Sequence, residues 1–116
     1  VIAGLDHRDQ YLKQSGWTES SDITVAMMLA KLDQYALSST IITDIQTDGM
    51  LAGPNKHDLG LYLPVTRHPI IISGGVRNAD DVRACYKAGA GGCIIGRSVL
   101  SGAFSIGDLS RLIRTI

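Results

Sequence analysis

The sequence has no excess of charge of either sign. Eleven lysines and arginines balance eleven aspartates and glutamates among 116 residues, and neither sign runs for more than a few positions. A nucleic-acid-binding domain normally carries a broad basic surface, so this balance argues against that class. Any anion that the protein binds must therefore be held by a local site.

Long apolar runs, a leader and cysteine-rich motifs are also missing. No run approaches the roughly 20 apolar residues that cross a bilayer, and the opening VIAGLD lacks the charged region and cleavage site of a signal peptide. Cys85 and Cys93 lack the spacing of metal ligands and the density of a disulfide scaffold. We expect a reduced, cytoplasmic protein with no membrane partner. The chain opens inside a predicted strand without an initiator methionine, as a fragment or a processed product does.

What is present is enough apolar sequence for one compact domain. Hydrophobic residues make up 45% of the chain, and short, uniformly apolar runs are predicted as strands at residues 1–6, 40–44, 70–73 and 91–96. Such runs are typical of parallel strands covered on both faces. The polar stretch 7–17 between the first strand and the first helix is predicted to be a functional loop or a small hairpin.

A helix is predicted after each strand. Residues 20–22 (SSD) form a cap signal for the first, a weaker helix at residues 56–63 is ended by Pro64, Asn78 caps a third that Gly89 closes, and Ser105 opens the last. Four repeats of strand and helix fit an open parallel sheet or a barrel. Every strand ends in polar or glycine residues, which favours a barrel with its chemistry on one rim. Because a complete barrel needs eight units and about 250 residues, four units make half of one.

The strings IIISGGV and CIIGRS are the strongest local signal. Two neighbouring strands each end in glycine and open a helix or turn, which leaves backbone N–H groups at a positive dipole end. This arrangement predicts a phosphate site, with Ser73 beside the substrate. The alternative is that the glycines only form tight turns. The predicted phosphate ligands are Gly74, Gly75, Gly96, Arg97 and Ser98.

Asp6 and Asp48 are the candidates for acid and base catalysis, because each stands where a strand end meets a loop. Asp48 also fits a simple Asp-Gly turn, and Asp6 a strand-end carboxylate that is already hydrogen-bonded. Thr43 and Asp44 either hold these aspartates in place or merely close the second strand.

The remaining candidates lie in loops. Trp17, the only tryptophan, either stacks on a planar substrate or pins its loop to the barrel. His7 lies beside Asp6 and is a candidate to modulate it. His57 and His68 lie in helix-start and loop contexts without acidic or histidine neighbours at ligand spacing, so we predict neither a metal nor a cofactor.

Taken together, the strings GLD, GW, TDIQTDGMLAGPN, IIISGGV and IIGRSVLSGAF resemble the second half of the phosphoribosyl-formimino-aminoimidazole-carboxamide ribotide isomerase family, including its actinobacterial bifunctional relatives. The resemblance runs along the whole chain. It implies that residues 1–116 form one C-terminal (βα)4 half of a (βα)8 barrel, units 5 to 8. It also implies an Amadori aldose–ketose isomerisation of a bisphosphorylated substrate in histidine biosynthesis.

The resemblance assigns roles to individual residues. Asp48 matches the general acid that protonates the furanose ring oxygen, with Thr43 nearby, and Asp6 matches the aspartate of the fifth strand. The glycines and Arg97 with Ser98 match the second phosphate site, and Trp17 matches a loop tryptophan beside the substrate.

The family's general base, an aspartate on the first strand, and its other phosphate site have no counterpart in these 116 residues. Activity is therefore expected only with an N-terminal half or in a homodimer that closes the barrel. Two alternatives stay open. One is the related cyclase barrel of imidazole glycerol phosphate synthesis, against which the GW loop and the GRS turn argue. The other is an inactive phosphate-binding half-barrel.

Overall fold

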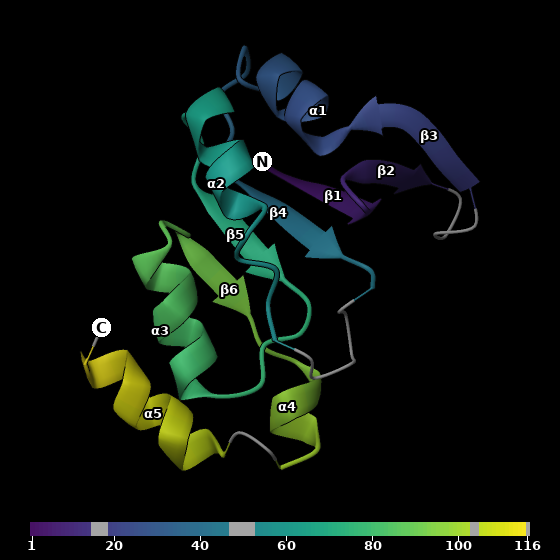
Figure 1. The fold of residues 1–116 in the computed structure, drawn as a ribbon. Helices are drawn as coiled ribbons and strands as arrows, with labels where there is room; N and C mark the ends of the chain where they lie inside the picture. Colours follow the sequence, from purple (N-terminus) through teal and green to yellow (C-terminus); the bar gives the residue numbers. More distant parts are fainter. Residues whose placement is uncertain (15–18, 47–52, 103–104, 116) are drawn as a thin grey trace.

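The computed structural model describes residues 1–14, 19–46, 53–102 and 105–115, which form a mixed α/β fold around one six-stranded sheet (Figure 1). The strand order across the sheet is β3-β2-β1-β4-β5-β6. The strands are β1 (Ile2–Arg8), β2 (Tyr11–Gln14), β3 (Glu19–Thr24), β4 (Ser39–Asp44), β5 (Ile70–Ser73) and β6 (Gly92–Ile94).

The four predicted strands are all present and parallel. β1 pairs with β4, β4 with β5 and β5 with β6, so their carboxyl ends lie at one edge of the sheet, called here the C-terminal rim. The register aligns Asp6 with Thr43, Thr43 with Ser73 and Ser73 with Ile94. These runs of β-branched residues form parallel strands because such side chains pack well on a pleated sheet.

β2 and β3 extend the sheet as an antiparallel ribbon, so of the two alternatives for the polar stretch the small hairpin is confirmed. The turn from β1 to β2 is made by Asp9 and Gln10, both with positive φ (51° and 73°), the sign that two-residue hairpin turns require. The predicted helix cap at residues 20–22 is wrong, because these residues belong to β3. Thr24 caps the helix instead, its Oγ1 accepting a hydrogen bond from the Met27 N–H at 3.1 Å.

The helices are α1 (Val25–Leu32), α2 (Leu59–Tyr62), α3 (Ala79–Lys87), α4 (Arg97–Leu100) and α5 (Ile106–Thr115). Asn78 caps α3 as predicted, since its Oδ1 accepts from the Asp81 N–H, and the Ser105 Oγ likewise accepts from the Asp108 N–H at the start of α5. The α-helix α2 ends before Pro64, as predicted, and a 3-10 turn, Leu63–Val65, follows it. None of the described helices is long and apolar enough to cross a membrane.

The hydrophobic core lies on the face of the sheet toward which Ile42 and Ile72 point, and α1, α2 and α3 pack against that face (Figure 1). The opposite face carries the alternate residues of the same strands and is partly open to solvent: Ile2 is 53% and Ile94 43% exposed. The apolar strands predict a sheet that is covered on both faces. Within the described residues, helices cover only one of them. The core consists of Val25, Leu29, Ile42, Leu59, Tyr62, Ile70, Ile72, Cys85 and Ala90.

Removing one core side chain of α1 tests this packing. Leu29 is completely buried whereas Met27, on the same helix, is 58% exposed. Leu29→Ala is expected to lower the free energy of unfolding by about 2–5 kcal/mol because it leaves a cavity. Met27→Ala should change it by less than about 0.5 kcal/mol. Urea denaturation followed by circular dichroism measures both, and equal effects would contradict the assignment of the core.

Candidate functional site

The C-terminal rim brings three of the predicted site residues together. Asp6, Thr43 and Ser73 are direct register partners on β1, β4 and β5, and partners in a parallel sheet point to the same face. All three are half-buried and lie on the face opposite the helices. A carboxylate and two hydroxyls in one row can hydrogen-bond a polyhydroxylated substrate.

Two glycine turns follow this row and are called here the glycine turns (residues 74–75 and 96–98). Gly74 and Gly75 have φ values of 107° and 79°, a conformation that side chains rarely adopt. Gly96 caps α4, which begins with Arg97. Because β5 and β6 are paired, the two turns leave the sheet side by side, as predicted.

The two residues at the start of α4 differ in exposure. Arg97 is exposed, so its guanidinium is accessible to an anion. Ser98 is fully buried, and its Oγ has no hydrogen-bond partner among the described residues. Its role as a phosphate ligand stays a prediction.

Asp48 and Trp17 lie outside the described residues. The chain that returns from Asp48 is described from Gly53 onward, and the Gly53 N–H donates to the Gly75 carbonyl oxygen at 2.9 Å. Gly53 itself has a φ of 99°, and a side chain there would meet the Arg77 guanidinium. The β4–α2 connection is therefore attached to the first glycine turn.

Behind the rim, on the helix face, lies a cluster of polar side chains that the sequence analysis largely missed. The Asn55 Nδ2 donates to Asp44 Oδ2 at 2.8 Å and to Asp58 Oδ2 at 2.7 Å, and the Gln10 Nε2 donates to Asp58 Oδ1 at 3.2 Å. Asp44, expected beside the catalytic aspartates, points into this cluster and away from Asp6. We call these residues the buried polar cluster: His7, Gln10, Asp44, Asn55 and Asp58.

A sequence signal for Asn55 and Asp58 did exist. They stand three residues apart before an apolar segment, the spacing of a polar turn that leads into a helix. The Asp58 N–H indeed donates to the Asn55 Oδ1 at 3.3 Å. The signal identifies a turn but not the burial of the Asp58 side chain.

His7 is 2% exposed, and burial lowers its pKa from the ordinary value of 6.5 against the opposing effect of Asp44, Asp58, Asp9 and Asp6. The Gln10 N–H donates to His7 Nδ1 at 3.2 Å, which requires that nitrogen to be unprotonated. His7 and Asp6 are adjacent in a strand and so point to opposite faces. The His7 and Asp6 side chains are therefore not in contact, and any effect of His7 on Asp6 acts across the strand.

Tyr62 packs beside this cluster, with its ring edge-on to His7 at a centroid distance of 6.3 Å. Burial raises the pKa of the Tyr62 phenol, and the negative charges of Asp58 and Asp44 raise it further. Tyr62 therefore stays protonated and neutral in the core. In the described part of the chain, no three His, Cys, Asp or Glu side chains gather as metal ligands would.

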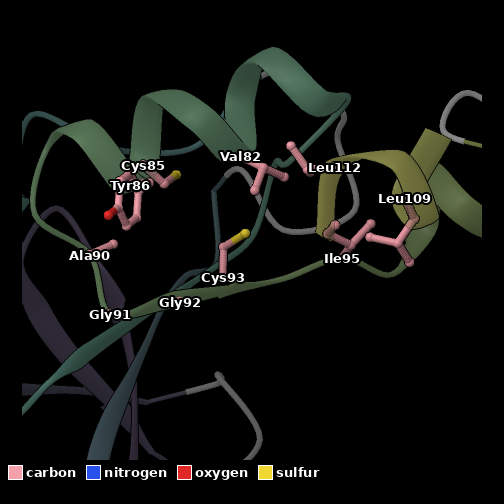
Figure 2. Close-up of a pocket in the computed structure, with 10 residues that line it drawn as sticks. All are labelled: Val82, Cys85, Tyr86, Ala90, Gly91, Gly92, Cys93, Ile95, Leu109 and Leu112. Atoms are coloured by element: carbon pink, nitrogen blue, oxygen red, sulfur yellow. The ribbon is translucent and has the colours of Figure 1, made fainter. Parts of the chain in front are cut away.

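A cavity of about 390 Å³ lies between α3, β6 and α5, on the helix side of the sheet (Figure 2). Its lining is mostly apolar, and Cys85 and Cys93 are among the side chains around it. Burial raises the pKa of the Cys85 thiol to about 11 and also raises that of Cys93, so both are protonated at neutral pH. This cavity lacks the charged groups that a phosphate needs, and the candidate site is the C-terminal rim.

The neutral state of His7 makes a prediction about acid stability. Because the folded-state pKa is lowered, the unfolded chain takes up the proton first as the pH falls below 6.5, and stability is lost from there down through the folded pKa. His7→Gln should therefore reduce the decline in unfolding free energy between about pH 7 and pH 5. Urea denaturation across that range measures the decline. The exposed His57→Gln is the control, and the same decline in both variants would contradict a buried neutral His7.

Comparison with known proteins identifies the family of this chain. The chain matches the model of a family described as histidine biosynthesis protein over residues 1–105. It is 38% identical over 105 residues to the 1-(5-phosphoribosyl)-5-((5-phosphoribosylamino)methylideneamino) imidazole-4-carboxamide isomerase of Ruthia magnifica subsp. Calyptogena magnifica. The aligned region covers 88% of this chain and 43% of that isomerase. An isomerase of the same name from Thermoanaerobacter pseudethanolicus is 35% identical over 102 residues, with 88% and 43% covered.

The match extends along nearly the whole chain in other relatives. The isomerase of the same name from Prochlorococcus marinus subsp. pastoris is 30% identical over 118 residues, covering 99% of this chain and 46% of that protein. The chain thus spans less than half the length of these curated relatives. The family match includes the rim row and both glycine turns. The chain therefore belongs to the histidine biosynthesis protein family.

Proposed function

We propose that this chain supplies the general acid and one phosphate site of an aldose–ketose isomerase of histidine biosynthesis. The observation that carries the proposal is the row Asp6–Thr43–Ser73 next to the glycine turns on one rim. The name of the related isomerases describes a molecule with two phosphoribosyl groups, which agrees with a bisphosphorylated substrate for this site. One of its phosphates is assigned to the glycine turns, with Arg97 as an added positive charge.

The chemistry needs an acid and a base. Asp48 gives its proton to the furanose ring oxygen as the bond from that oxygen to the anomeric carbon breaks, which opens the ring to an imine. A base then removes the proton from the carbon next to the protonated imine, which gives an enaminol. The former anomeric carbon gains a proton and the enol hydroxyl loses its own, which gives the ketose. Asp6 and the Thr43 hydroxyl hold the substrate at the barrel mouth.

The base and the second phosphate site have to come from outside these residues. We propose that the chain is the C-terminal (βα)4 half of a (βα)8 barrel, units 5 to 8. Its helices cover one face, and its open face carries Ile2 and Ile94 as the lining of a barrel would. β2 pairs with β1 at His7 and Arg8, beyond the segment of β1 that a further barrel strand would join.

Two partners can complete such a barrel: an N-terminal half or a second copy of this chain. A second copy would bring two Asp6 residues and two pairs of glycine turns to the mouth, which suits a substrate with two phosphates. Size-exclusion chromatography with light scattering separates the two possibilities. A monodisperse monomer at micromolar concentration would exclude the homodimer and leave the N-terminal half.

The proposal predicts complementation. Mixing the chain with a separately produced N-terminal half of such an isomerase should give isomerisation of the bisphosphate substrate without ammonia. Replacing the acid, Asp48→Asn, should lower kcat by about 10²–10⁴-fold, the usual contribution of a general acid. Absorbance assays of the mixture measure both quantities.

Each other outcome has a definite meaning. A cyclisation that depends on ammonia would assign the chain to the related cyclase. A well-folded complex without activity would make the chain an inert phosphate-binding half. Full activity of Asp48→Asn would remove Asp48 from the mechanism.

A further inference from the structure

The buried polar cluster connects the two strands whose ends carry the candidate catalytic aspartates. Ile45, the first residue after β4, donates its N–H to the His7 carbonyl oxygen at 3.0 Å, and Gln46 donates its N–H to Asp44 Oδ1 at 3.0 Å. These two bonds fix the start of the β4–α2 connection, in which Asp48 lies. The first of them attaches it directly to β1, the strand that carries Asp6.

The far end of the same connection is fixed by Asn55. Its single Nδ2 group donates one proton to Asp44, at the end of β4, and the other to Asp58, immediately before α2. The Asn55 Oδ1 accepts from the Asp58 N–H, and two residues earlier the Gly53 N–H bonds the Gly75 carbonyl. Both ends of the connection are thus held together through one amide side chain.

The chemistry of the cluster requires an uncharged donor of this shape. Asp44 and Asp58 are 6% and 7% exposed, and buried carboxylates need hydrogen-bond donors because desolvation is costly. The side-chain amide is a donor of two protons from one nitrogen. The near-isosteric Asp offers neither proton and adds a third negative charge, and Ala leaves both carboxylates short of a donor.

We propose that Asn55 is a positioning residue that, by bridging Asp44 and Asp58, holds together the two ends of the β4–α2 connection, the segment to which the proposed general acid belongs. This inference rests on the proposed function for its catalytic consequence only. Asn55 acts through Asp44 and Asp58, and it does not touch the substrate.

Amide hydrogen exchange tests the anchoring without any activity. In Asn55→Ala, exchange of the Gln46 and Gly53 amides should accelerate about tenfold or more, the factor that corresponds to 1.4 kcal/mol of lost local stability. The milder Asn55→Ser, which keeps one donor, should give a smaller acceleration and covers the case that the alanine variant does not fold. The Ile72 amide, in the central strand β5, is the internal reference.

The matched control is Thr24→Ala, which removes the cap of α1, a side-chain hydrogen bond of similar kind outside the buried polar cluster. It should leave Gln46 and Gly53 exchange unchanged relative to Ile72. Equal acceleration in Thr24→Ala and the Asn55 variants, or no acceleration in the latter, would overturn the anchoring role.

Kinetics of the complex with an N-terminal half test the catalytic consequence. The Asn55 variants should lower kcat about tenfold or more while KM changes by less than about threefold, since the misplaced group acts in the transition state. Thr24→Ala should keep both constants. An unchanged kcat, or a rise in KM alone, would overturn the catalytic consequence of the Asn55 bridge. An inactive wild-type complex would instead defeat the proposed function, and the exchange data would still decide whether Asn55 is the anchor.

Discussion

The parallel register of β1, β4 and β5 is the constraint on which the rest of the structure depends. Because Asp6, Thr43 and Ser73 are Cα partners, three side chains from distant parts of the chain reach the same level on the same face. A shift of one residue in either pairing would turn one of them toward the helices. The glycine turns then begin where the strands end, so the register also sets their height on the rim.

The two faces of the sheet carry different kinds of polar group. The rim row lies on the open face, where Asp6, Thr43 and Ser73 can meet a substrate. One residue further along, His7 and Asp44 are also register partners, and they point into the core toward Asn55, Asp58 and Tyr62. Alternation along the strand thus separates substrate-facing groups from groups that hold the loops, although both sets lie within two residues of each other.

Much of this arrangement follows from local sequence, and the failures have identifiable causes. Short apolar runs mark all four parallel strands, and Asn78 and Ser105 mark helix starts, because these signals act over a few residues. Residues 20–22 have the residue types of a helix cap, yet they belong to β3, and only the pairing of β3 with β2 decides between the two structures. The orientation of Asp44 was unpredictable for a similar reason, since a uniformly apolar strand does not reveal which face its residues occupy.

The most direct test of the account is whether the glycine turns bind phosphate. Titrating the 15N-labelled chain with inorganic phosphate should shift the backbone amides of residues 74–76 and 96–98 together, with one saturation curve in the millimolar range expected of a partial site. Sodium chloride at the same ionic strength should leave those amides in place. Shifts scattered over exposed lysines and arginines, or the same shifts with chloride, would contradict a phosphate site on the C-terminal rim.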